Sequence, residues 1–235
     1  MPVTSTGSTE IEPGARRTQK ERRTRTQARL LDATIECLAE LGWSKTSTTE
    51  VARRAGVSRG AQQHHYPTKM SLVDAAVEHL LDQQRQAYEA AFAELPPERH
   101  NVEGALDLLW DVFRSPSARA MLELAVASRT DPELHALCVD LNDRVLDLIL
   151  VTFEQLFPQT NLPDGSVPTT LRTVHAMFVG LSVHNALDDD VHGHQRAVLE
   201  QVKSLARQLI PDPEADPRDT RHDAGTQGTR PGNPH

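Results

Sequence analysis

The stretch Thr46–Val77 reads TSTTEVARRAGVSRGAQQHHYPTKMSLVDAAV and contains two short helical segments joined by a glycine. Thr48 or Thr49 is expected to cap the first segment, because hydroxyl side chains accept hydrogen bonds from the free amides at a helix start. This segment should end near Ala55, and Gly56 supplies the turn that follows. A short helix, a glycine-containing turn and a second short helix are together typical of a helix-turn-helix.

The second short helix is expected to follow Ser58 as its cap and to stop at Pro67, since proline lacks the amide hydrogen that a helix needs. Gln62 and Tyr66 lie on nearly one side of it and are expected to pack inward. The opposite arc carries Arg59, Gly60, Gln63 and His64. Arginine can read guanine and glutamine can read adenine through paired hydrogen bonds, and a glycine lets the helix backbone approach a groove wall. This arc is therefore expected to face DNA.

The sequence resembles the tetracycline-repressor (TetR) family of bacterial regulators. The resemblance is carried by Gly42-Trp43, Thr48-Thr49, Ala55-Gly56-Val57-Ser58, Gly60-Ala61 and His65-Tyr66-Pro67-Thr68-Lys69. It implies that the following residues contact bases or the nearby backbone: Thr48, Thr49, Arg59, Gln63, His64 and His65. It also implies that Lys69, at the start of the next helix, contacts a phosphate. The chain departs from many members at Gln62-Gln63, where they carry Leu-Tyr.

Outside this motif the apolar residues recur every three or four positions and never alternate in a sustained way, which predicts an all-α fold of about nine helices. Beyond the two short helices, the expected helices cover residues 24–41, 69–94, 102–114, 118–129, 132–157, 169–187 and 195–209, with Thr68 and Asp131 as caps. We expect a DNA-binding domain over residues 19–68 and an effector-binding and dimerisation domain over 69–210. Residues 1–18 are rich in Thr, Ser, Gly, Pro and Arg, residues 211–235 have almost no apolar side chain to bury, and both ends are expected to be disordered.

The charge is divided unequally along the chain. The net charge is −8, yet residues 1–70 contain 12 Lys+Arg and 7 Asp+Glu. A basic N-terminal part is what a phosphate-binding domain requires. The cations before or at the start of the first helix are Arg16, Arg17, Lys20, Arg22, Arg23 and Arg25. They form either an arm that adds phosphate or minor-groove contacts or a solvated tail without a defined site.

In the C-terminal half, the resemblance implies that helices five to seven enclose a ligand cavity and that helices eight and nine form a homodimer with their copies. The eighth helix has an apolar face of Val174, Met177, Phe178, Leu181 and Leu187, with Gly180 beside it, and the ninth has Val198, Val202, Leu205 and Leu209. Packing within one chain is the alternative. Candidate effector-binding residues are Trp110, Phe113, Met121, Phe153 and His175, which could equally be core.

Several classes of protein are excluded. There is no membrane-spanning run and no secretory leader, so the chain is expected in the cytoplasm with Cys37 and Cys138 unpaired. No nucleophile elbow, phosphate loop or metalloprotease motif is present, so we expect neither an enzyme nor a cofactor. His192-Gly193-His194 beside Asp188–Asp190 matches no closed structural metal site, so it is expected to be a polar connection between the eighth and ninth helices and no metal is expected; a metal-sensing repressor is the minor alternative.

The expected function is that of a dimeric repressor that binds a pseudo-palindromic operator and is released by a small-molecule effector. The alternatives are a transcriptional activator of the same fold and a helical interaction module without DNA affinity.

Overall fold

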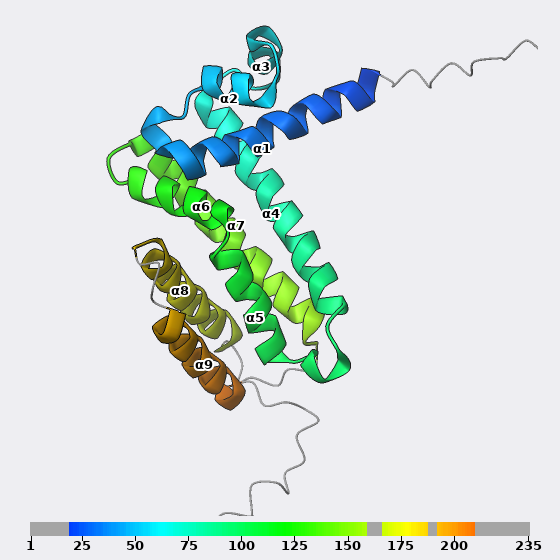
Figure 1. The fold of residues 1–235 in the computed structure, drawn as a ribbon, viewed down its shortest axis with the longest axis vertical. Helices are drawn as coiled ribbons and strands as arrows, with labels where there is room; N and C mark the ends of the chain where they lie inside the picture. The colour runs from blue at the N-terminus through cyan, green and yellow to red at the C-terminus, as the bar shows by residue number, and fades with distance from the viewer. Residues whose placement is uncertain (1–18, 159–165, 188–191, 210–235) are drawn as a thin grey trace, which may run out of the picture. The chain divides into compact units, whose positions relative to one another are not determined.

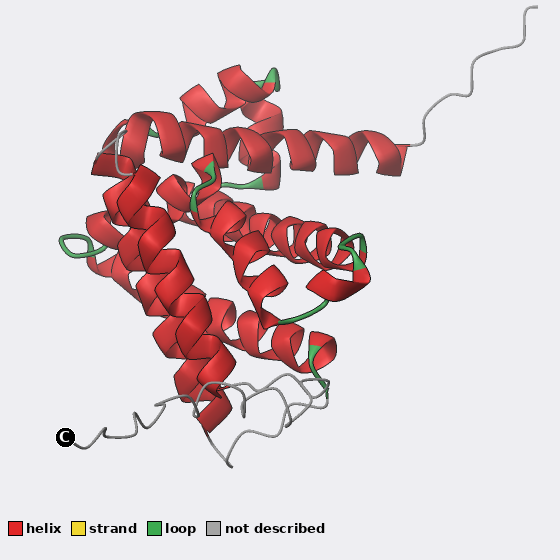
Figure 2. Ribbon diagram, turned by 60° about the horizontal axis from the view of Figure 1, so that its bottom comes forward, coloured by secondary structure: helices red, strands yellow, loops and turns green. Residues whose placement is uncertain are grey.

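The computed structural model describes residues 19–158, 166–187 and 192–209 (Figure 1). Every regular element within these ranges is helical, as Figure 2 shows, so the predicted all-α fold is confirmed. The α-helices are α1 (Gln19–Lys45), α2 (Thr48–Ala55), α3 (Arg59–His65), α4 (Lys69–Ala93), α5 (Val102–Phe113), α6 (Pro116–Ala127), α7 (Pro132–Leu156), α8 (Ser166–Leu187) and α9 (His192–Leu209), and η1 (Pro97–Arg99) is a short 3-10 helix. None of these helices is both long enough and apolar enough to cross a membrane.

The chain divides into two compact units. The first is built from residues 1–86 and 114–145, of which the described part begins at residue 19. The second is built from residues 87–113 and from residue 146 onward. Helices α4 and α7 each begin in the first unit and end in the second.

The core of the first unit has two clusters of buried apolar side chains. One joins α1, α2 and α4 and contains Leu30, Leu31, Ala33, Cys37, Val51, Ala55, Leu72 and Ala76. The other joins α1 and α4 to α6 and α7 and contains Leu38, Val73, Val77, Ala120, Leu124, Leu134 and Leu141. Burial of this apolar surface holds the short helices α2 and α3 on a rigid support, since helices of seven or eight residues are not stable alone.

Three of the predicted caps are confirmed. The Ser58 hydroxyl accepts from the Ala61 amide at 3.2 Å, Thr68 Oγ1 accepts from the Ser71 amide at 3.0 Å, and Asp131 Oδ1 accepts from the amides of residues 133 and 134 at 3.1 Å. The cap of α2 was predicted wrongly, because Ser47 caps it instead of Thr48 or Thr49, accepting from the Glu50 amide at 3.2 Å. The preceding Thr46 donates its hydroxyl to the Gly42 carbonyl at 2.8 Å, and Ser47 has the extended backbone conformation of a cap.

Helix α1 begins at Gln19, five residues before the predicted start at Thr24. The first turns of α1 contain no apolar residue, so no hydrophobic periodicity in the sequence indicates a helix there. Their Lys, Arg, Glu and Gln residues are nevertheless good helix formers. Gly42 interrupts the helix as expected, with φ 76 and ψ 172. Helix α6 begins at Pro116 after the cap Ser115, because proline suits the first turn of a helix.

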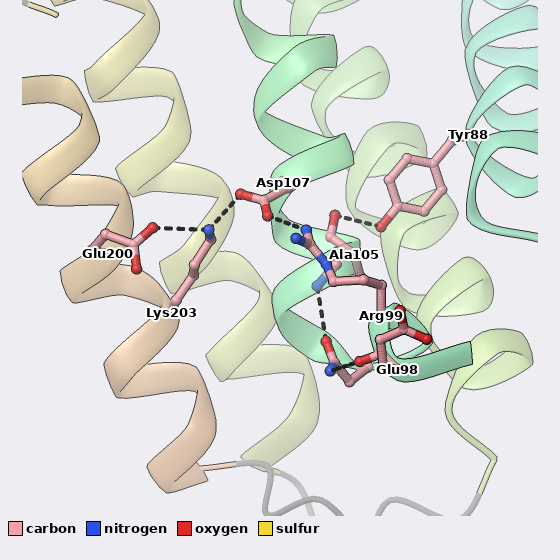
Figure 3. A network of polar contacts seen from close by, with 9 residues as sticks. Tyr88, Glu98, Arg99, Ala105, Asp107, Glu200 and Lys203 are labelled. Atoms are coloured by element: carbon pink, nitrogen blue, oxygen red, sulfur yellow. Dashed lines mark hydrogen bonds and ion pairs between the residues drawn. The ribbon is translucent and has the colours of Figure 1, made fainter. Parts of the chain in front are cut away.

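In the second unit, α5, α8 and α9 surround a core of Leu106, Phe178, Leu199, Val202 and Ala206. Lys203, only 7% exposed, lies in this unit among carboxylates (Figure 3). Its Nζ atom is 2.5 Å from Asp107 Oδ1 and 3.0 Å from Glu200 Oε1, and Arg99 pairs with the other Asp107 oxygen. Burial opposes the charge of Lys203, but the hydrogen bonds that it donates to Asp107 and Glu200 raise its pKa. The Asp107 carboxylate on α5 thus pairs with Arg99 of η1 and Lys203 of α9 and joins the three elements.

Candidate functional site

Helix α3 presents a polar face to solvent. Arg59, Gly60, Gln63 and His64 are exposed, as the sequence predicts. A Cβ atom added at Gly60 would meet no atom within 4 Å, so nothing in the protein covers the helix there. This face combines the side chains that can read base edges with a bare backbone position.

The opposite side of α3 is fixed by two buried contacts. Gln62 is 3% exposed, and its Nε2 donates to the Tyr66 carbonyl at 2.7 Å, which closes the end of the helix. Burial raises the pKa of Tyr66, against the opposing effect of a hydrogen bond with Gln27 on α1. Because the buried Gln62 amide satisfies the Tyr66 carbonyl, the rotation of α3 is fixed and its polar face points outward. The departure from Leu-Tyr at Gln62-Gln63 therefore has a structural role at its first position.

His64 and His65 adjoin each other at the end of α3, with ring centroids 5.7 Å apart. His65 is half-buried, and burial lowers its pKa, aided by the charges of Arg23 and His64. Its Nδ1 atom is buried and finds no hydrogen-bond partner among the described residues. This environment therefore favours the neutral form of the ring. Thr48 is half-buried and Thr49 is exposed at the first turn of α2.

Lys69 does not extend freely into solvent. Its Nζ donates to the Trp43 carbonyl at 2.5 Å and lies 3.5 Å from the centroid of the Trp43 ring. Burial lowers the pKa of Lys69, with an opposing effect from Asp131. The Trp43 amide in turn donates to Glu123 Oε1 on α6 at 2.8 Å. The backbone of one residue therefore joins the start of α4 to α6.

The contact between Trp43 and Glu123 links residues 80 positions apart and has no signal in the sequence. Gly42 makes it possible in two ways. Its φ of 76 lies in the region that glycine favours, and an added Cβ atom would come within 2.7 Å of Glu123 Oε1. We call Gly42, Trp43, Lys69 and Glu123 the Trp43 node.

The five candidate effector-binding residues do not form one group. Trp110, Phe113 and His175 lie in the second unit around the buried Phe178, with Phe113 5.6 Å from His175 and 5.4 Å from Phe178 between ring centroids. Burial lowers the pKa of His175. Phe153 belongs to the same unit and pairs with Phe157 at 5.2 Å. Met121 packs against the second core cluster of the first unit.

The apolar faces of α8 and α9 are partly buried within their own unit. Phe178 and Val202 are core, while Val198 and Leu205, seven positions apart on α9, are 41% and 48% exposed. Gly180 on α8 is exposed, and an added Cβ atom there would meet nothing within 4 Å. The side chains of Leu187 and Leu209, and the acidic and histidine cluster at 188–194 considered for metal, lie outside the residues whose side chains the structure describes.

Comparison with known proteins identifies relatives of both halves of the chain. Residues 30–76 match the model of the bacterial regulatory proteins of the tetR family, and residues 98–211 match that of the C-terminal part of BetI-type transcriptional repressors. An uncharacterized HTH-type transcriptional regulator of Mycobacterium bovis is 36% identical over 118 residues, which are 50% of this chain and 60% of that protein. The HTH-type transcriptional regulator CymR of Pseudomonas putida is 40% identical over 119 residues, 51% of this chain and 59% of that one. The matches thus span about three fifths of these relatives.

The same fold occurs in a solved regulator from Saccharomonospora viridis in complex with choline. It has a TM-score of 0.59 and 16% sequence identity, and the match covers 80% of this chain and 98% of that one. The relatives are transcriptional regulators and not enzymes, in agreement with the expectation from the sequence. The two family models together extend from the helix-turn-helix through α9, and the chain belongs to the tetR family of bacterial regulatory proteins.

Proposed function

We propose that this protein is a dimeric, sequence-specific DNA-binding transcriptional regulator, and that it is a repressor released from its operator by a small molecule. The observation that carries the proposal is the face of α3, where Arg59, Gln63 and His64 are exposed while Gln62 on the other side is buried. A helix that is fixed by its buried side and exposes side chains able to form two hydrogen bonds with one base can read bases in the major groove. A protein with this partner works where the genome is, in the cytoplasm.

In this proposal residues 19–68 form the DNA-binding domain, and 69–210 form the effector-binding and dimerisation domain. Arg59 and Gln63 read bases, Gly60 allows close approach, and Thr48, Thr49, His64 and His65 contact the nearby backbone or bases. Lys69 contacts a phosphate, which requires its ammonium to exchange the Trp43 carbonyl for a phosphate oxygen. Both acceptors are oxygen atoms, and the phosphate has the stronger charge.

The dimer forms through α8 and α9. Val198 and Leu205 supply an exposed apolar row on α9, and Gly180 supplies a bare site on α8 for close helix approach. A two-fold dimer places two copies of α3 about 34 Å apart and requires a pseudo-palindromic operator.

The effector is a small molecule that contacts the aromatic group of Trp110, Phe113 and His175, and Phe153 and Met121 take a lesser part. Helix α4 transmits its binding, because this one helix starts next to α3 at Lys69 and continues into the unit that holds the aromatic group. Coupling of this kind typically amounts to ~1 to 3 kcal/mol.

The test is a selection of genomic DNA fragments by the purified full chain, followed by titration of the best fragment at several salt concentrations. Enrichment of one pseudo-palindrome is the expected result. Affinity that is independent of sequence would overturn the proposal, and dimerisation without any DNA affinity would favour an interaction module. A reporter gene placed behind the operator then separates a repressor from an activator.

A further inference from the structure

An open cavity of about 270 Å³ lies in the first unit, between α1, α4 and the first turn of α6. Its apolar lining comes from Leu80, which is buried, and from Ile35 and Ala39, which are half-buried. Pockets that enclose drug-sized ligands have volumes of roughly 300 to 1,000 Å³. The cavity is therefore suited to a smaller molecule with an apolar part.

The mouth of this cavity is acidic. Asp32 and Glu36 lie one turn apart on α1, both line the cavity, and both are exposed. Among the described residues that line it there is no lysine or arginine. Like charges four positions apart on a helix repel each other. A positive group bound at the mouth would relieve this repulsion.

The neighbours of the two carboxylates leave most of this charge in place. Asp32 Oδ1 lies 3.2 Å from His79 Nε2, and an imidazole is positively charged only when it is protonated. Glu36 Oε2 lies 4.0 Å from the Arg54 guanidinium, which pairs more closely with Glu40, at 2.7 Å. The positive end of the α6 dipole also borders the cavity, but it amounts to about half a charge against two carboxylates. The mouth is therefore negative on balance.

The lining favours an organic cation over a metal ion. In the part of the chain that the structure describes, no group of three or more His, Cys, Asp or Glu side chains could hold a metal ion. An ammonium group can instead donate charge-assisted hydrogen bonds to Asp32 and Glu36, while an apolar body attached to it lies against Leu80. The cavity thus combines the two features that bind a molecule with one charged end and one apolar end.

We propose that this cavity is a binding site for a small amphipathic organic cation, with the ammonium on Asp32 and Glu36 and the apolar body on Leu80. The site is additional to the aromatic group named in the proposed function, and it does not depend on DNA binding. Helices α1 and α4 both line it, and both contribute to the core cluster that supports α2. An occupant would therefore join the two helices on which the helix-turn-helix rests.

The test is isothermal titration calorimetry of the purified full chain with n-hexylammonium chloride, in about 0.1 M salt so that distant charges are screened. Saturable binding at one site per chain is expected. Hexanol and hexanoate lack the positive charge and should bind at least about tenfold more weakly, the low end for losing a charge-assisted hydrogen bond. Butylammonium should bind about 15-fold more weakly, because each lost methylene contact costs about fourfold.

The decisive variant combines Asp32→Asn and Glu36→Gln. Both residues are exposed, so the variant should fold, and its affinity for hexylammonium should fall by about tenfold or more. The matched control combines Glu133→Gln and Asp143→Asn, which remove the same charge from exposed positions on α7, a helix that does not line the cavity. The control should bind hexylammonium as the wild type does.

Four results would overturn the inference. The first is a wild type that does not bind hexylammonium. The second is wild-type affinity in the variant of Asp32 and Glu36, since the ammonium then binds elsewhere, for example on the aromatic group. The third is an equal loss in the control, because only the net charge of the protein would then matter. The fourth is hexanoate bound as tightly as hexylammonium, which would show that the site does not select a cation. None of these results bears on the proposed DNA binding.

Discussion

Replacing Gly42 by alanine should destabilise the first unit through the Trp43 node. A residue with a side chain at φ 76 and ψ 172 is strained, which costs about 1 to 3 kcal/mol. The new Cβ atom would stand 2.7 Å from Glu123 Oε1 and 3.2 Å from Glu123 Cδ. The carboxylate can turn away because it is the end of a flexible side chain, but it then releases the Trp43 amide that donates to it at 2.8 Å.

The released hydrogen bond has a charged acceptor, and such bonds contribute about 1.5 to 3 kcal/mol, with the lower value suited to a half-buried carboxylate. Together with the backbone strain, Gly42→Ala should lower the free energy of unfolding by about 2 to 5 kcal/mol. For a chain of this size, at about 2 to 4 °C per kcal/mol, the melting temperature should fall by about 4 to 20 °C.

The assay is thermal unfolding followed by far-ultraviolet circular dichroism at one protein concentration, because a dimer's melting temperature depends on concentration. Gly60→Ala is the matched control, since its Cβ atom meets nothing within 4 Å and its helical site should gain up to about 1 kcal/mol. In the background of Glu123→Ala the carboxylate is already gone, so Gly42→Ala should there cost only the backbone strain of about 1 to 3 kcal/mol. Losses that simply add in the double variant, or a Gly42→Ala protein as stable as Gly60→Ala, would refute this account of the node.

Three further measurements address the DNA face, the lysine and the buried histidine. Arg59→Ala and Gln63→Ala should each relax base preference by about 1 to 3 kcal/mol at one operator position in a binding selection, and a uniform loss over all sequences would show that they contact only the backbone. Lys69→Ala should weaken binding to all sequences and reduce the salt slope by about 0.9, whereas an unchanged slope with lowered stability would confine Lys69 to the Trp43 carbonyl. Because burial lowers the pKa of His175 below its ordinary value of 6.5, the unfolded chain binds the proton more readily, so the stability that this group contributes is complete above pH 6.5 and is lost as the pH falls below it. His175→Gln should flatten the fall in melting temperature between pH 7.5 and 5.5, and a fall as steep as in the wild type would show that His175 does not cause it.

Much of the fold could be predicted because its signals are local. The glycine turn at Gly56 and the caps Ser58, Thr68 and Asp131 depend on residues within three positions of each other, and the structure confirms them. The α2 cap was predicted wrongly although it is equally local. Four hydroxyl residues stand in a row there; the Thr46 hydroxyl donates to the Gly42 carbonyl, and Ser47 has the extended backbone of the cap.

The candidate site shows the same division. The exposed and buried sides of α3 follow from helical period, so the sequence predicts which side chains face outward. The distribution of the effector candidates does not follow from it. Met121 and Phe113 are both large apolar residues on helices, yet one packs in the first unit and the other in the second. The periodicity of apolar residues shows which face of a helix is buried, but it does not show which other helix packs against that face.

By itself the sequence determined the helical fold, the helix-turn-helix and the outward face of α3, because helix periodicity, caps and glycine turns act over a few residues. Only the tertiary structure decided that Lys69 lies on the Trp43 carbonyl, that Glu123 holds the Trp43 amide, and that Arg29 on α1 donates to the Gly56 carbonyl. Each of these depends on which helices pack together, and a contact between residues 80 positions apart is set by the burial of whole helix faces that no local pattern specifies.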